Sequence, residues 1–212
     1  MTRKTDPPHL QFEKDLWESG LKHIAGLDEA GRGALAGPVA VGAVILSPDP
    51  HLSRTLACVR DSKQMTPRQR DLCAPHIQEI ALAWSVAFAS PEEIDRFGIV
   101  HATRLAGMRA VNALTPQPVF LLTDFRLELP EIELPQASLP KGDACCLSIA
   151  AASVLAKTAR DMLMCELDGQ YPGYGLGQNK GYGTQAHRSA LKRLGYSSIH
   201  RKSFSLKELR IT

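Results

Sequence analysis

The chain has 212 residues, of which 44% are hydrophobic and 22% charged, with a formal net charge of +3. These values are typical of one soluble globular domain that buries a full core without needing a disulfide or a metal ion. No apolar run approaches the roughly 18 residues of a membrane span, and the N-terminal 20 residues contain no apolar signal segment, so we expect a cytoplasmic protein that contacts no membrane.

In the first half of the chain, an apolar run at residues 24–28 and a β-prone run at 38–46 (PVAVGAVIL) predict two buried strands. The stretch between them, EAGRGALAG, is rich in glycine and small residues and predicts a loop. A threonine and a proline at 66–67 fit the start of a helix, which Pro75 should kink or split. A third buried strand is predicted at residues 81–88.

In the second half, SPEE at residues 90–93 fits a capping box and predicts a helix that runs to about residue 114. A strand at 118–124 follows and ends on a carboxylate, and residues 125–142 have little periodicity, which predicts a connecting loop. Two further helices are predicted, at residues 147–167, stopping at Asp168-Gly169, and at 186–194. Strands followed by helices indicate an α/β layered domain with a helical C-terminal part.

Four acids stand where such a fold places its sites: Asp28, Glu29, Asp124 and Asp143. The first three end predicted strands, and the fourth precedes a helix. Clustered carboxylates repel each other unless a cation lies among them, and oxygen ligands favour Mg²⁺ or Mn²⁺. Alternation along a strand turns Asp28 and Glu29 to opposite faces, so both reach one site only if their strand ends there. Taken singly, each acid also fits an ordinary exposed residue at a strand end.

The five cysteines are odd in number and form no C-x-x-C pair, so we expect free thiols in a reducing cytoplasm. Charge is concentrated at the C-terminus, where residues 180–212 hold eight lysine or arginine residues and one glutamate. This distribution favours a polyanionic partner, although a solvated basic helix face explains it equally well.

Several motifs together resemble the ribonuclease HII family, in its order and spacing, over roughly residues 20–206. The motifs are IAGLDEAGRGALAGP from residue 24, DSK with QMTPRQR from 61, LLTD from 121, KGDACCLSIAAASVLAKTARD from 141, KGYGTQAHRSAL from 180 and SSIHRKSF from 197. Two departures stand out. Phe125 follows the third acid where the family has glycine, and Tyr196 and Ser198 replace prolines in a turn that this change should loosen.

The resemblance implies an RNase H-like fold, a central mixed sheet flanked by helices with a helical C-terminal region. It divides the chain into an N-terminal extension (1–20), a catalytic domain (21–170) and a basic C-terminal region packed on that domain (171–212). By motif position, Asp28, Glu29, Asp124 and Asp143 would be the catalytic acids and would hold two Mg²⁺ or Mn²⁺ ions. The implied enzyme, a monomer by default, cleaves RNA–DNA hybrids and nicks duplex DNA on the 5′ side of single ribonucleotides, leaving a 3′-hydroxyl and a 5′-phosphate.

The resemblance also implies substrate contacts. Backbone groups of Gly31-Arg32-Gly33 would bind the 2′-hydroxyl, with Arg32 on the adjacent phosphate, and Tyr182 would pack on the sugar that follows the ribonucleotide. Further candidate phosphate contacts are Lys63, Lys157, Arg160, Lys180 and His187. Two other functions remain open at this stage: a Mg²⁺-dependent phosphohydrolase of small molecules, and a nucleic-acid-binding module without catalysis.

Overall fold

The computed structural model describes residues 7–49 and 51–204. Its centre is a five-stranded sheet in the order β3-β2-β1-β4-β5. Strands β1 and β4 are parallel, as are β4 and β5, whereas β2 is antiparallel to both of its neighbours. The strands are β1 Ile24–Ala30, β2 Val39–Ile45, β3 Ala83–Ala89, β4 Phe120–Asp124 and β5 Gln136–Leu139. The predicted central mixed sheet is therefore confirmed.

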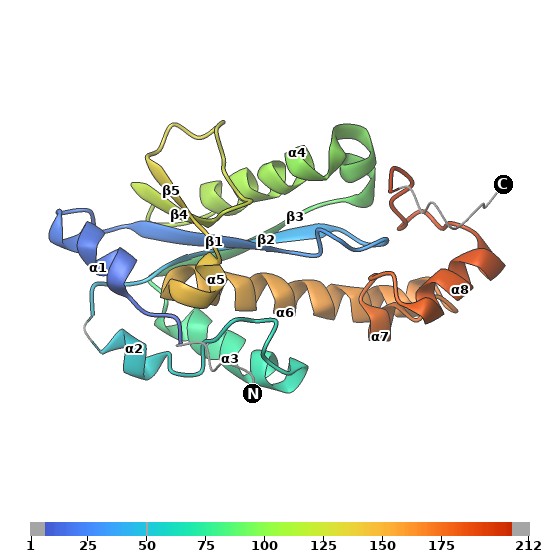
Figure 1. The fold of residues 1–212 in the computed structure, drawn as a ribbon, viewed down its shortest axis with the longest axis horizontal. Coiled ribbons are helices and arrows are strands. Elements are labelled where there is room, and N and C mark those ends of the chain that lie inside the picture. Colours follow the sequence, from blue (N-terminus) through green and yellow to red (C-terminus); the bar gives the residue numbers. More distant parts are fainter. Residues whose placement is uncertain (1–6, 50, 205–212) are drawn as a thin grey trace.

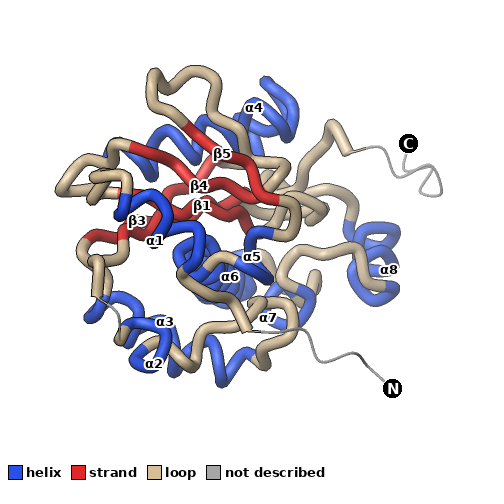
Figure 2. Tube along the Cα trace, turned by 60° about the vertical axis from the view of Figure 1, so that its left-hand side comes forward, coloured by secondary structure: helices blue, strands red, loops and turns tan. Residues whose placement is uncertain are grey.

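Helices cover both faces of this sheet. They are α1 Gln11–Glu18, α2 Leu52–Thr55, α3 Pro67–Ile80, α4 Pro91–Asn112, α5 Gly142–Cys145, α6 Leu147–Gln170, α7 Leu176–Asn179 and α8 Gln185–Leu194. Helix α4 lies on one face, and α6 lies on the other with α3 beyond it (Figures 1 and 2). The two C-terminal helices, α7 and α8, gather at the end of α6 that is remote from α1 (Figure 1).

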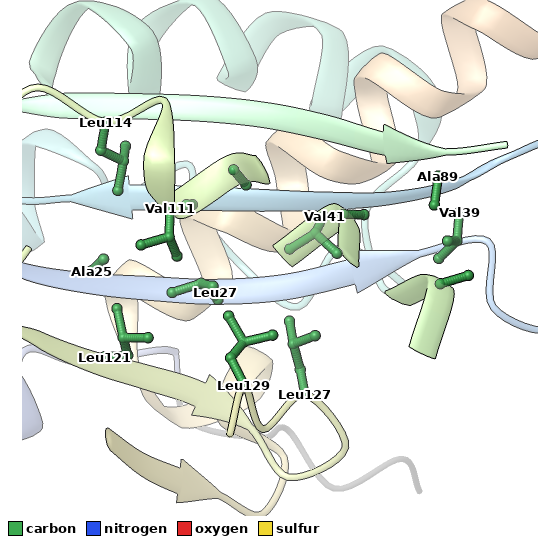
Figure 3. Packing of buried hydrophobic residues seen from close by; sticks show 14 of the residues in the cluster. Ala25, Leu27, Val39, Val41, Ala89, Val111, Leu114, Leu121, Leu127 and Leu129 are labelled. Carbon is green, nitrogen blue, oxygen red and sulfur yellow. The ribbon is translucent and has the colours of Figure 1, made fainter. Parts of the chain in front are cut away.

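Two buried layers of apolar side chains hold the helices on the sheet. One layer joins the sheet to α4, and Figure 3 shows Leu27 of β1 and Val111 of α4 within it. In the other layer, small residues let α6 approach closely. A Cβ atom added at Gly26 would lie 2.3 Å from the backbone of Ser148, and one at Gly42 would lie 2.3 Å from the carbonyl oxygen of Ala152. Substitution at either glycine would therefore push α6 away from the strands that carry the acids.

The sequence predicts strands β1 to β4 and helices α3, α4, α6 and α8, but not α1, α2, α5 and α7. The capping box predicted at Ser90 is present, and the predicted N-cap Thr66 forms a second one with Gln69. Helix α3 continues through Pro75, and α4 contains a non-helical residue at Gly98. Helix α6 runs past the predicted stop to Gln170, and the predicted loop at 125–142 contains strand β5. Strand β5 pairs with β4, and all four of its residues are half-buried, so its sequence carries little of the buried–exposed alternation that marks a strand.

The N-terminal segment contributes a helix that sequence reasoning missed. Glu13 of α1 is 1% exposed, and its Oε1 accepts a hydrogen bond of 2.8 Å from the backbone N–H of Ser148 in the first turn of α6. A carboxylate at this end of α6 satisfies an unpaired donor and complements the helix dipole. Residues 9–18 thus brace the start of α6, next to α5.

The thiol prediction is wrong for one pair of cysteines. Cys58 and Cys73 form a disulfide with their Cα atoms 6.0 Å apart, because α3 folds back beside the segment that follows α2. The other three cysteines (Cys145, Cys146 and Cys165) are free, as predicted. No helix among the described residues has the length and apolar character needed to cross a membrane.

Candidate active site

The acids meet where β4 ends beside β1. The parallel pairing of these strands stops at Leu27 with Thr123, and β1 then runs on alone along this edge. Asp28 and Glu29 therefore lie just beyond the end of the β4 ladder, next to Asp124. Their own strand, β1, ends one residue after Glu29, at Ala30, where its pairing with β2 also stops.

Three of the four acids form a tight group. Asp28, Glu29 and Asp124 each contribute an oxygen atom, and these atoms all lie within 4.8 Å of one another. Asp28 is 3% exposed and hydrogen-bonded to Ser153 of α6. The Oδ1 atom of Asp124 accepts a hydrogen bond of 2.8 Å from the backbone N–H of Gly142, the first residue of α5. Neighbouring strands and two helices thus fix the group.

The fourth acid, Asp143, lies in α5 at the border of this group. It is not one of the three residues whose oxygen atoms converge, but its charge acts on Asp28. Its Oδ2 atom accepts a hydrogen bond of 2.7 Å from Lys63 Nζ, and the Lys63 side chain is otherwise largely exposed. Partial burial opposes the charge of Lys63, but the hydrogen bond to Asp143 and the negative charges of Asp143, Asp28 and Asp61 together outweigh this effect and raise the pKa of Lys63. Lys63 therefore contacts a site acid.

The group is electrostatically strained. Burial raises the pKa of Asp28 well above its ordinary value, and the negative charge of Glu29 raises it further. Among the described residues, the buried Oε2 atom of Glu29 has no hydrogen-bond partner, while its Oε1 lies 3.5 Å from Arg32 Nη1. Buried, converging oxygen atoms with an unsatisfied member fit a hard divalent cation, which would bind several of them at once.

The glycine motif, Gly31-Arg32-Gly33, follows β1 directly and lies next to Glu29. Gly31 is buried with a φ of +89°, and a Cβ atom there would lie 1.9 Å from the Nε atom of Arg160. Gly33, by contrast, is exposed, and apart from its chain neighbours no residue of 7–49 or 51–204 has an atom within 4 Å of its Cβ position. Arg32 is half-buried and donates a hydrogen bond of 3.1 Å to the carbonyl of Arg126. The first glycine thus serves the packing, and the second leaves open space.

Two buried arginine side chains fix this loop by donating hydrogen bonds to backbone carbonyls in and next to it. Arg160 is fully buried and donates to the carbonyls of Pro38, Ala36 and Lys180, at 2.8, 3.1 and 2.9 Å. Arg201, also fully buried, donates to the carbonyls of Gly37 and Arg32, each at 2.9 Å. The expectation that Arg160 contacts phosphate is therefore corrected, because its guanidinium is enclosed and its donors are used within the protein.

We expect Arg160→Met to lower the free energy of unfolding by about 3 kcal/mol or more, because the buried carbonyls of Pro38 and Ala36 and the half-buried carbonyl of Lys180 would lose a donor. Urea denaturation followed by circular dichroism measures the change. Lys192→Met on the exposed face of α8 is the matched control and should shift the unfolding free energy by less than about 0.5 kcal/mol. A similar small change in both variants would contradict the structural role of Arg160.

The remaining basic candidates have partners within the protein. Lys157 Nζ forms an ion pair of 2.7 Å with Asp161 and lies 5.2 Å from the centre of the Tyr182 ring. Lys180 Nζ hydrogen-bonds to the Sγ atom of Cys165 at 2.7 Å. Tyr182 itself is half-buried, with the Arg160 guanidinium 5.4 Å from its ring centre.

His187, the last basic candidate, is fully buried and its Nε2 lies 3.1 Å from Nε2 of His200. The expectation that it contacts phosphate is corrected, because no face of the ring is available. Burial lowers the pKa of His187, and burial together with the neighbouring His187 lowers the pKa of His200 to about 4.

This depressed pKa predicts that acid destabilises the fold. Between about pH 6.5 and 4, His200 binds a proton in the unfolded chain but stays neutral in the folded protein. The unfolding free energy should therefore decrease as pH falls through this range, by on the order of 2 kcal/mol. Stability from this group is complete above pH 6.5. Urea titrations at several pH values measure the slope, and His200→Gln should flatten it. An unchanged slope in the variant would contradict the assignment.

Comparison of the sequence and structure with known proteins identifies the family of this chain. The Ribonuclease HII family model matches residues 25–207. Ribonuclease HII of Dehalococcoides mccartyi is 50% identical over 198 residues, which cover 93% of each chain. The crystal structure of ribonuclease H2 from Pyrococcus horikoshii, 25% identical, superposes with a TM-score of 0.69 over 86% of this chain and 93% of that one.

The ribonuclease HII of Archaeoglobus fulgidus, solved as a complex with PCNA, is 27% identical and superposes with a TM-score of 0.71 over 84% of this chain and 92% of that one. These matches decide against a small-molecule phosphohydrolase and against a binding module without catalysis. The chain belongs to the ribonuclease HII family, endoribonucleases that cleave RNA in RNA–DNA hybrids.

Proposed function

We propose that Asp28, Glu29, Asp124 and Asp143 are the catalytic centre of this ribonuclease and hold two Mg²⁺ or Mn²⁺ ions. The observation that carries the proposal is the convergence of three carboxylates, one with a buried oxygen atom that has no hydrogen-bond partner in the part of the chain that the structure describes. Such ions would lower the pKa of the attacking water and stabilise negative charge on both the attacking and leaving oxygens. Asp143, held by Lys63, would complete the ligand set from the side of α5.

RNA recognition would come from the loop between β1 and β2. Gly33 is exposed and has open space at its Cβ position, so a sugar can approach its backbone closely. Backbone groups there would hydrogen-bond the 2′-hydroxyl, which DNA lacks, and Arg32 would contact the neighbouring phosphate. The enzyme would then nick duplex DNA on the 5′ side of an embedded ribonucleotide, leaving a 3′-hydroxyl and a 5′-phosphate.

The direct test uses duplex DNA that contains one ribonucleotide, incubated with the protein and Mg²⁺ or Mn²⁺. We expect a single nick 5′ to the ribonucleotide and no product with EDTA. An otherwise identical all-DNA duplex is the control. Cleavage of both duplexes at the same rate would overturn the role of the glycine loop.

Tyr182 is proposed to pack on the sugar of the nucleotide after the ribonucleotide. For Tyr182→Ala we expect single-ribonucleotide cleavage to fall about tenfold more than cleavage of a long RNA–DNA hybrid, because lost sugar packing matters most where one position alone is recognised. Single-turnover rates on the two substrates measure the ratio, with Tyr182→Phe as the conservative control. Equal losses on both substrates would contradict a junction role.

A further inference from the structure

A chain of hydrogen bonds runs beneath the Tyr182 loop, and its direction follows from one fixed donor. The backbone N–H of Ser197 lies 3.1 Å from Nδ1 of His200. A backbone N–H can only donate, so Nδ1 must accept, and a neutral His200 then carries its proton on Nε2. The Ser197 hydroxyl lies 2.8 Å from the same Nδ1 and is compatible with this assignment.

The tautomer of His187 follows from that of His200. Nε2 of His200 faces Nε2 of His187 at 3.1 Å, so one nitrogen donates and the other accepts. Because His200 carries the proton, His187 accepts at Nε2 and holds its own proton on Nδ1. That Nδ1 lies 3.0 Å from the carbonyl oxygen of Tyr182, to which it donates. We call this chain the histidine relay: Ser197, His200, His187 and the Tyr182 carbonyl.

The surroundings keep the relay neutral and rigid. His187 and His200 are 0% and 1% exposed. The ring of Tyr174 packs on His200 with centroids 4.6 Å apart, and the Tyr196 ring meets it edge-on at 5.9 Å. A proton added to either ring would set two donors against each other at one of the contacts, and burial disfavours the charge as well.

The relay ends next to the site. Along the α6 helix, Ser153 contacts Asp28, and Lys157, one turn further, lies beside the Tyr182 ring. Ser153 and Lys157 are four residues apart and lie on one face of α6, so the helix that contacts Asp28 also borders the Tyr182 loop. The carbonyl of Gly181 also accepts hydrogen bonds from Leu35 and Ala36, which ties this loop to the glycine loop.

We propose that His187 and His200 are positioning residues that fix the Tyr182 loop, and through it the selectivity of the enzyme for single embedded ribonucleotides. Neither ring reaches the substrate. The selectivity part rests on the proposed role of Tyr182, whereas the relay itself rests on the contacts above.

The relay is tested first without any substrate. Long-range ¹H–¹⁵N correlation spectra of the full-length protein, labelled at histidine and recorded near pH 7, report which ring nitrogen carries the proton. Ser197→Pro, which removes the backbone donor, assists assignment of His200. We expect His200 protonated on Nε2 and His187 protonated on Nδ1. Either ring in the opposite tautomer, or as a cation, would overturn the relay.

The functional consequence is tested with two substitutions at His187. His187→Phe keeps an aromatic ring at this position but removes the N–H that donates to the Tyr182 carbonyl. His187→Asn places an amide N–H near the position of the lost Nδ1. We expect the phenylalanine variant to lose about fivefold to tenfold more rate on a single ribonucleotide than on a long hybrid, as expected for one lost hydrogen bond. The asparagine variant should recover most of this selectivity.

Ser189→Ala, on the exposed face of the same helix, is the matched control and should keep the wild-type ratio. Equal losses on both substrates in His187→Phe, with Tyr182→Ala still selective, would overturn the positioning role. If Tyr182→Ala itself shows no selectivity, the proposed function of the tyrosine fails, and the tautomers still decide the relay. Should His187→Phe not fold, the asparagine variant and the spectra carry the test.

Discussion

Asp124→Asn should abolish nicking of a single embedded ribonucleotide, with a rate loss of at least about a thousandfold. The amide removes one negative oxygen from the group that Asp124 forms with Asp28 and Glu29. The fold should survive, because the remaining side-chain carbonyl can still accept the hydrogen bond from Gly142. Single-turnover cleavage in saturating Mg²⁺ measures the loss.

We also expect Asp124→Asn to change the stability of the metal-free protein. Since the charges of its neighbours raise the pKa of Asp28, removing one of them should raise the unfolding free energy by about 1 kcal/mol in EDTA. Glu128→Gln, an exposed acid just after the same strand, is the control and should leave both rate and stability unchanged. Wild-type activity in Asp124→Asn would remove this residue from the catalytic centre.

Gly31→Ala should be strongly destabilising, whereas Gly33→Ala should not. At Gly31 the backbone has a φ of +89°, and the new methyl group would overlap the buried guanidinium of Arg160. We expect a loss of about 3 kcal/mol or more in unfolding free energy and at least a hundredfold loss in cleavage, because the whole loop must shift. Gly33 has open space, so Gly33→Ala should change stability by less than about 0.5 kcal/mol.

The two glycines therefore separate packing from recognition. If a sugar approaches the backbone at Gly33, the added methyl group should still lower single-ribonucleotide cleavage by about tenfold in a protein of normal stability. Thermal unfolding and cleavage rates measured on the same samples test this difference. A stable, fully active Gly31→Ala would contradict the packing account, and an unaffected Gly33→Ala would contradict the recognition account.

The sequence predicts the sheet and the acids well because their signals are local. The apolar runs that become β1, β2 and β4, the threonine and proline that begin α3, and the capping box that begins α4 depend on neighbouring residues alone. The acids follow such strands, and their motif context identifies the family. What local patterns cannot predict is why Asp28 and Glu29 reach one place, since that depends on where the parallel partner β4 ends.

The sequence does not predict which basic residues are buried, because their burial depends on tertiary packing. Arg160 and His187 resemble surface cations in the sequence, but both are enclosed where the C-terminal segment closes over the β1–β2 loop. The turn at Tyr196 and Ser198 is likewise held, because Ser198 Oγ lies 2.9 Å from the Tyr171 hydroxyl. A pairing such as Cys58 with Cys73 also requires knowledge of how α3 folds back.

Anomalous diffraction from crystals soaked in Mn²⁺ examines the central idea directly. We expect strong manganese peaks bounded by the carboxylates of Asp28, Glu29 and Asp124, with the Asp143 carboxylate contacting at least one of these peaks. Asp124→Asn crystals treated in the same way should show no such peaks. Manganese bound elsewhere, with these four side chains left without a metal at saturating concentration, would contradict it.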